Sequence, residues 1–187
     1  MNKPNGYDST QTGSEYTPIT LGGHTAIIKK VVETTSTSGK PMIKVAIDFD
    51  MNDSQPEYFM NAFKADDRPD KKWPYQGTQY IVTEDSFGNC SKAFKAFITS
   101  AEQSNNATCV WGNGFANWFT NKKIGVVYGI VEEEYNGEVK RRHRIRFFCR
   151  YDGALEQQAP KPRLLDTQPQ SDGFVPVSGT DAPPIPF

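Results

Sequence analysis

Apolar and polar residues alternate along several stretches of the chain, and this alternation predicts β-strands. Residues 24–34 are rich in β-branched side chains, and residues 42–51 alternate regularly. Successive side chains of a strand point to opposite faces, so the second stretch has one apolar side. That side carries Ile43, Val45, Ile47 and Phe49. A turn at Gly39 and Pro41 separates the two stretches, which predicts a hairpin.

The middle of the chain changes from strand to helix periodicity. Residues 51–77 have a short apolar run at 58–63 and then a charged loop, which predicts an insertion or a wide loop, and residues 78–84 predict a short strand. Residues 89–106 place apolar side chains at the i, i+3, i+4, i+7 spacing of one helical face, with Asn89 or Ser91 as the N-cap. That face carries Phe94, Phe97, Ile98 and Ala101. A second, shorter helical spacing joins Phe115, Trp118 and Phe119.

Residues 123–151 predict a long hairpin that turns at Asn136 and Gly137, because an Asn-Gly pair between alternating segments favours a tight turn. The expected order is therefore two or three strands, one substantial helix and two strands. This order predicts a mostly β protein with an OB-fold-like five-stranded Greek-key barrel and a helix between strands 3 and 4. An open α+β sandwich is the alternative.

The last predicted strand carries the strongest candidate for a binding site. Alternation places His143, Ile145, Phe147, Cys149 and Tyr151 on its inner side. The outer side then carries Lys140, Arg142, Arg144, Arg146, Phe148 and Arg150. Five cations around one aromatic, with no carboxylate among them, suit a chain of phosphates flanked by bases. The competing interpretation is a charged, solvated sheet face.

Other candidates for nucleic-acid contact lie outside that strand. Lys44 extends the basic and aromatic platform from a neighbouring strand, and Lys122 and Lys123 continue it at the start of the fourth strand. Trp73 follows two lysines in the wide loop and is a candidate for stacking on a base, or else an anchor of that loop. The core is expected to take the remaining large aromatics, Trp111, Trp118 and Phe119.

Charge divides the chain into a mildly basic body and an acidic tail. The 187 residues carry a net charge of -1, but residues 1–151 hold 19 Lys and Arg against 17 Asp and Glu. Residues 152–187 hold 2 against 5, and seven of the 13 prolines. We therefore expect a flexible arm at 1–22, an OB-type nucleic-acid-binding domain at 23–151, and a disordered acidic tail at 152–187. The tail would compete with DNA for the basic face.

The sequence gives little support for catalysis, metal binding or membrane insertion. The three cysteines are far apart and lack metal-ligand spacing, so no metal or other cofactor is expected. Aspartates in residues 48–53 and 65–70 could suggest a magnesium-dependent nuclease, but the partner residues of such a site are missing. No apolar segment is long enough to span a membrane, so we expect a non-catalytic, cytoplasmic protein.

The chain resembles single-stranded DNA-binding proteins of bacteria and their phages, in particular those of phages and prophages of Gram-positive bacteria. The resemblance rests on the strand order, on "SGKPMIKVAIDF" and "KKIGVVYGIVEEEYNGEVKRR", and on the terminal Ile-Pro-Phe. It implies sequence-tolerant binding of single-stranded DNA in replication and recombination, and it leaves open a homodimer. It also implies that a terminal tip recruits replication or recombination proteins. The tip residues are Asp181, Ile185, Pro186 and Phe187.

An OB-type module can also serve a different purpose, since one fold hosts many functions. The alternative to DNA binding is therefore a protein-interaction or virion structural module.

Overall fold

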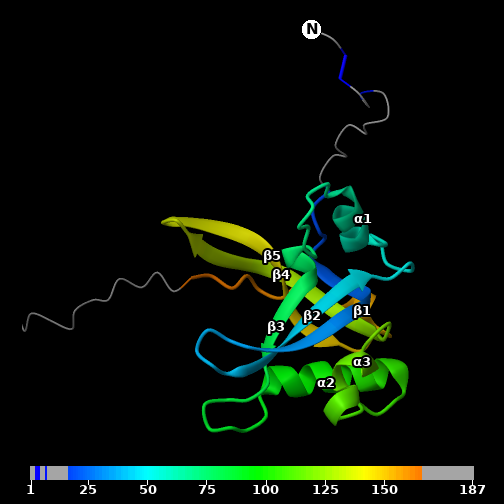
Figure 1. Ribbon diagram of the computed structural model, residues 1–187, viewed down its shortest axis with the longest axis vertical. Helices are drawn as coiled ribbons and strands as arrows, with labels where there is room; N and C mark the ends of the chain where they lie inside the picture. Colours follow the sequence, from blue (N-terminus) through cyan, green and yellow to red (C-terminus); the bar gives the residue numbers. More distant parts are fainter. Residues whose placement is uncertain (1–2, 5–6, 8–16, 166–187) are drawn as a thin grey trace, which may run out of the picture.

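The protein is mostly β: a computed structural model, which describes residues 3–4, 7 and 17–165, shows a five-stranded antiparallel sheet with helices at its two ends (Figure 1). The strands are β1 (Gly22–Thr35), β2 (Pro41–Phe49), β3 (Thr78–Val82), β4 (Lys123–Tyr135) and β5 (Glu138–Cys149). The helices are α1 (Tyr58–Ala65), α2 (Lys92–Asn105) and α3 (Phe115–Trp118), with short 3-10 turns η1 (Tyr75–Gly77), η2 (Gly112–Gly114) and η3 (Ala154–Glu156). The five predicted strands and the helix between the third and fourth are confirmed.

The sheet is open, so the prediction of a closed barrel is wrong. Its strand order is β3-β2-β1-β4-β5, and β3 and β5 are its edges. The short β3 does not reach β5, and η1 fills the space between the two edges through side chains. The guanidinium carbon of Arg144 lies 4.3 Å from the ring centroid of Tyr75, and the Tyr128 hydroxyl donates to the Gln76 carbonyl at 2.8 Å.

The hydrophobic core lies between one face of the sheet and the helices. The predicted inner residues of β2 are all buried, and so are the four residues of the predicted helical face of α2. The Phe97 ring of α2 packs against the rings of Phe119 and Phe148, with centroids 5.0 and 5.1 Å away. Ser91 caps α2 by accepting a hydrogen bond from the Phe94 amide at 3.2 Å. Of the two predicted caps, Asn89 and Ser91, the second is therefore confirmed.

Two buried carboxylates hold the segment between β2 and α1. Asp48 Oδ1 accepts hydrogen bonds from the amides of Phe59 and Met60, at 2.9 and 3.3 Å, and so satisfies the free N–H groups at the start of α1. Asp53 accepts a hydrogen bond from His24 Nδ1 at 2.9 Å, and the imidazole ring is stacked on Phe49 at 4.2 Å. The wide loop predicted for residues 51–77 is therefore an ordered segment that contains a helix.

A β-bulge in β5 reverses the predicted inward and outward pattern of its last residues. Ile145 pairs with Tyr128 and Phe147 pairs with Val127, so Arg146 is an extra residue in the strand. After a bulge the alternation of side chains continues in the opposite phase. Phe148 is consequently 9% exposed in the core, whereas Phe147 is 41% exposed. The expected exposure of Phe148 is wrong for this reason.

The expected disorder of the chain from residue 152 is wrong as far as residue 165. Ala154 of η3 is fully buried over Gly23 and Gly125, where a Cβ atom at either glycine would clash with it. Further along, Arg163 pairs in parallel with β4: its amide donates to Ile130 and its carbonyl accepts from Glu132, at 3.0 and 2.9 Å. We call residues 152–165 the C-terminal strap.

The N-terminal arm, expected to be flexible through residue 22, is packed from residue 17. Ile19 is 1% exposed in the core, its carbonyl accepts a hydrogen bond from His143 Nδ1 at 2.7 Å, and the Thr17 carbonyl accepts one from Tyr58 at 2.6 Å. Within the described residues, no helix is long and apolar enough to cross a membrane. The predicted tip residues Asp181, Ile185, Pro186 and Phe187 lie outside the described part of the chain.

Candidate nucleic-acid interface

The cations in and just after β5 do not form a free basic stripe, because carboxylates of β4, of β5 itself and of the strap pair with most of them. Arg144 donates two hydrogen bonds to Glu133, both at 2.7 Å, and Arg142 lies 3.5 Å from the same carboxylate. The hydrogen bond from Arg144 is the main reason that the pKa of Glu133 lies below its usual value. Lys140 pairs with Glu138 at 2.9 Å, and Arg150 pairs with Asp152 at 2.8 Å.

The register of the hairpin explains this neutralisation. Glu132 stands directly opposite Arg141 and pairs with it at 3.0 Å, whereas Glu133 stands opposite Lys140 and reaches along β5 to Arg142 and Arg144. Cross-strand pairs of opposite charge stabilise an antiparallel ladder. The signal was present in the sequence: folding the "VEEEY" segment back over the basic strand at the predicted Asn-Gly turn aligns the two charge runs.

Arg146 makes hydrogen bonds to backbone carbonyls of its own chain. Its guanidinium donates to the carbonyl of Ile130 at 3.3 Å and to that of Lys161 at 3.0 Å. It therefore links β5 to β4 and to the C-terminal strap. With Phe148 in the core, the structure does not bring the predicted β5 residues together as one exposed, unpaired surface.

Trp73 anchors the loop before η1 onto the sheet, which is the second of its two predicted roles. Its indole N–H donates to the Ile47 carbonyl at 3.0 Å, and its half-buried ring packs against the core and against Phe63. Lys122 and Lys123 lie beside aromatic rings of their own chain. Their ammonium groups are 5.3 Å from Trp118 and 5.0 Å from Tyr151, respectively.

A better candidate surface lies on the outer side of β1, β2 and β3, where cross-strand neighbours form three rows. We call it the cross-strand face. Its rows are Thr34–Met42–Val82, Val32–Lys44–Tyr80 and Lys30–Ala46–Thr78. None of these nine residues is acidic, and the Lys44 ammonium lies 5.8 Å from the Tyr80 ring. Tyr80 is 44% exposed and Val32 39% exposed, whereas Thr78 is buried, so the face offers one ring and aliphatic groups between two lysines.

The composition of this face suits unpaired nucleic acid. Lysines can neutralise phosphates, while an exposed tyrosine ring and aliphatic side chains can support unstacked bases. Sequence analysis had selected Lys44 from this surface, but not Lys30, Val32 or Tyr80. The β-bulge of β1, where the register shifts between Ile28 and Lys30, decides which of its residues point outward, and it leaves no mark in the periodicity.

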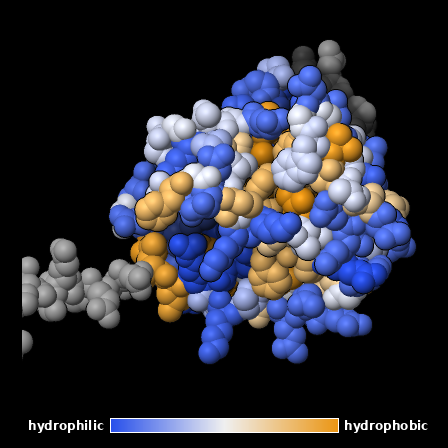
Figure 2. Space-filling model, turned by 90° about the horizontal axis from the view of Figure 1, so that it is seen from below, coloured by the Kyte–Doolittle hydropathy of each residue, from blue (hydrophilic) through white to orange (hydrophobic). Residues whose placement is uncertain are grey.

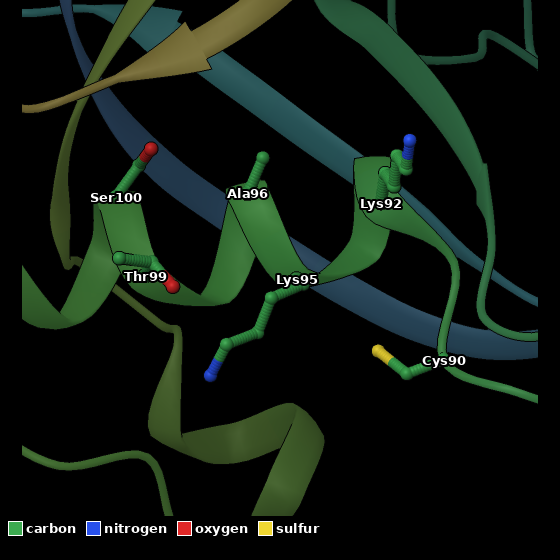
Figure 3. A pocket seen from close by; sticks show the side chains of 6 residues that line it. All are labelled: Cys90, Lys92, Lys95, Ala96, Thr99 and Ser100. Carbon is green, nitrogen blue, oxygen red and sulfur yellow. The ribbon is translucent and has the colours of Figure 1, made fainter.

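A hollow of about 600 Å³ along α2 has less chemical definition (Figure 3). Lys95 and Thr99 point to one side of the helix and Ala96 and Ser100 to the other, while the ammonium of Lys92 points away from Cys90. The side chains do not converge on one point, so this hollow is not the candidate site.

The described residues also show no cluster suited to a metal ion. Within them, no group of three or more His, Cys, Asp or Glu side chains could hold a metal ion. Two of the aspartates that raised the possibility of a nuclease, Asp48 and Asp53, have structural partners: backbone amides and His24.

No protein-family model matches the chain, and no curated protein matches it closely enough to indicate homology. The resemblance to single-stranded DNA-binding proteins thus stays a prediction, and the function has to be argued from the surface itself.

Proposed function

We propose that the protein binds single-stranded DNA without catalysis, through the cross-strand face of an OB-type sheet. The observation that carries the proposal is the combination of Lys30, Lys44 and the exposed Tyr80 on one face without a carboxylate. The strand order β3-β2-β1-β4-β5, with α2 between β3 and β4 along the chain, supports an OB assignment, because OB-folds can be partly open. In such folds the face of strands 2 and 3 is the usual nucleic-acid surface.

The geometry favours an unpaired strand over a duplex. A base that is stacked in a duplex cannot lie flat on Tyr80, whereas every unpaired base has a ring face to offer. Stacking tolerates any base, so binding is expected to be independent of sequence. Contacts between lysines and phosphates release counterions, so binding is also expected to weaken as salt rises.

In this proposal the β5 arginines contribute less to DNA binding than the cross-strand face does. A phosphate would have to compete with Glu133, the carboxylate that Arg142 and Arg144 share. Exchange of one anion for another yields less free energy than contact with a free cation. The cross-strand face therefore replaces the β5 strand as the main interface, and Lys44 belongs to it.

The predicted partners and cellular location belong to the same proposal. We propose that the tip at Asp181, Ile185, Pro186 and Phe187 recruits replication or recombination proteins, and that the protein acts in the cytoplasm of a bacterial host. The acidic charge and terminal apolar residues of the sequence support a docking peptide of this kind. A homodimer would also be compatible with the proposal.

Fluorescence anisotropy of a labelled oligonucleotide tests the proposed function. We expect the full-length protein to bind single-stranded DNA more tightly than duplex of the same length, and more tightly at 50 mM than at 200 mM salt, as phosphate contacts require. The double variant K30A/K44A should reduce the slope of log K against log salt by about 1.4, and Y80A should weaken binding about five- to tenfold.

The double variant R142A/R150A is the matched control, since it also removes two positive charges. We expect it to change affinity less than about twofold, because both side chains have carboxylate partners. If the control weakens binding and the face variants do not, the interface lies on β5. Absence of single-strand binding in the full-length protein would refute the function.

The neutralised charges of β5 favour a second candidate, a protein-interaction or virion structural module. A hairpin with both signs of charge and exposed Tyr135 and Val139 can pair with a complementary protein surface. The anisotropy titration separates the two candidates, because a module of this kind would leave the labelled strand free.

A further inference from the structure

A groove of about 560 Å³ lies between the end of the β1–β2 hairpin and the segment that follows α2. Its wall combines the strand ends with three aromatic residues. The lining includes Thr34, Met42, Glu33, Glu84, Phe94, Trp111 and Phe115. Figure 2 shows the side of the molecule on which α2 and α3 lie, where hydrophobic residues gather between hydrophilic ones. Since Thr34 and Met42 also belong to the cross-strand face, the groove begins where that face ends.

Trp111 is the most exposed ring of this groove. Sequence analysis placed it in the core, but it is 61% exposed. Its ring is stacked on Phe115 with centroids 5.4 Å apart and planes inclined by 20°, and Phe94 contacts it at 6.3 Å. Two core aromatics therefore support one side of the indole and leave much of its surface free. A supported, exposed aromatic ring is a suitable stacking surface because little side-chain freedom is lost on binding.

Charge divides the groove from the face beside it. The residues that line the groove include two carboxylates, Glu33 and Glu84, and neither Lys nor Arg. Lys30 and Lys44 lie on the cross-strand face instead. Phosphate would be repelled from the groove and attracted to the face. The N–H groups of a base can donate hydrogen bonds to carboxylates, and its ring can stack on the indole of Trp111. The groove therefore suits a base without its phosphate.

We propose that the groove holds one unpaired base of the bound strand, stacked on Trp111, while its phosphates stay on the cross-strand face. This inference rests on the proposed function and extends it by a second stacking position. The ligand is a base of single-stranded DNA, and its identity is not selected by stacking.

Intrinsic fluorescence isolates this contact, because the protein has three tryptophans in different environments. Trp73 is bonded to the Ile47 carbonyl, Trp118 packs against the core, and Trp111 is exposed. Each variant is titrated with oligothymidine while anisotropy of a labelled strand reports binding separately. In the full-length protein we expect binding to quench the emission. W111F should retain most of the affinity and lose the quenching, whereas W118F, the matched control, should retain both.

W111A adds a measure of affinity. It should weaken binding about five- to tenfold, with thermal melting used to show that the variant is folded. Quenching that persists in W111F, together with unchanged affinity of W111A, would overturn the base position in the groove and leave the proposed function intact. No anisotropy change in the full-length protein would instead remove the proposed function, and this inference with it.

Discussion

Asp53 shows how a single buried carboxylate can determine local structure. It accepts hydrogen bonds from the His24 ring and from the amides of Thr25 and Gln55, at 2.9, 2.9 and 3.0 Å. Burial raises the pKa of Asp53, but the hydrogen bonds and the charge of His24 outweigh burial and hold that pKa below its usual value. The ionised form is thus the one that the fold prefers.

We expect D53N to lower the free energy of unfolding by about 1 to 3 kcal/mol at pH 7, since the amide keeps one acceptor oxygen but replaces the other with a donor that faces buried donors. Urea denaturation measures this, and the exposed D67N is the control. Because the pKa of Asp53 is depressed by folding, its stabilisation is present above the unfolded-state pKa and is lost as pH falls through the folded-state pKa. The wild type should therefore lose its advantage over D53N in acid, and a constant difference would contradict this role.

Residue-scale prediction from sequence succeeded where periodicity alone decides orientation. The inner residues of β2 follow from apolar side chains at every second position, and the buried face of α2 follows from apolar side chains three or four positions apart. It failed for Trp111 and for Asp53, whose environments depend on segments far away in the chain. Neither the exposure of a loop tryptophan nor the pairing of an aspartate with His24 has a local signature.

At the scale of elements, the bulge at Arg146 places two adjacent phenylalanines on opposite sides of β5, so their substitutions should differ in their effect on stability. F148A should lower the free energy of unfolding by about 3 to 5 kcal/mol, because Phe148 is packed against Phe97 in the core. F147A should cost less than about 1 kcal/mol, since this ring is largely outside the core. Chemical denaturation of both variants measures the difference. The reverse order would mean that β5 alternates without a bulge.

The β4–β5 hairpin supplies its own counter-charges, and removing one of them should create a basic surface. E133Q frees Arg142 and Arg144 from their shared carboxylate. We expect it to tighten single-strand binding several-fold at low salt and to steepen the salt dependence, as additional phosphate contacts would. Anisotropy titrations at two salt concentrations measure both quantities.

D66N is the control for that experiment, because it changes the net charge equally and frees only Arg68 in a separate loop. Equal tightening in both variants would indicate a general effect of net charge. Unchanged affinity of E133Q would place the hairpin away from the path of the strand. The sequence contained both charge runs and the turn between them, so the pairing could have been predicted. The bulge could not, because it depends on the fit of β5 to β4.

For the whole molecule, the central question is where the folded unit ends. The sheet leaves the outer surface of Gly23 and Gly125 bare, and the C-terminal strap covers it with Ala154. The Gly23 amide donates to the Gln157 carbonyl at 2.8 Å, and Arg163 extends the free edge of β4. Composition suggested a boundary at residue 151, because prolines and polar residues dominate the chain beyond that position. Tertiary packing of a few small residues extends the unit to at least residue 165.

Two truncations test this boundary and the role of the acidic tail. Ending the chain after Tyr151 removes the strap and should lower the free energy of unfolding on the order of 3 kcal/mol, because Ala154 and the hydrogen bonds at Gly23 are lost. Ending it after Leu165 keeps the strap and removes Asp166, Asp172 and Asp181. Stability should then stay within about 0.5 kcal/mol of the full-length protein.

The chain that ends after Leu165 also tests whether the acidic tail competes electrostatically with DNA. If the tail carboxylates occupy the lysines of the cross-strand face, their removal should tighten single-strand binding at 50 mM salt and have little effect at 200 mM, because salt screens an exposed charge contact. Anisotropy titrations of both proteins measure this. A variant with all three aspartates changed to asparagine in the full-length chain is the control. It should behave like the truncation if charge is the cause, whereas wild-type affinity in both would show that the tail does not compete.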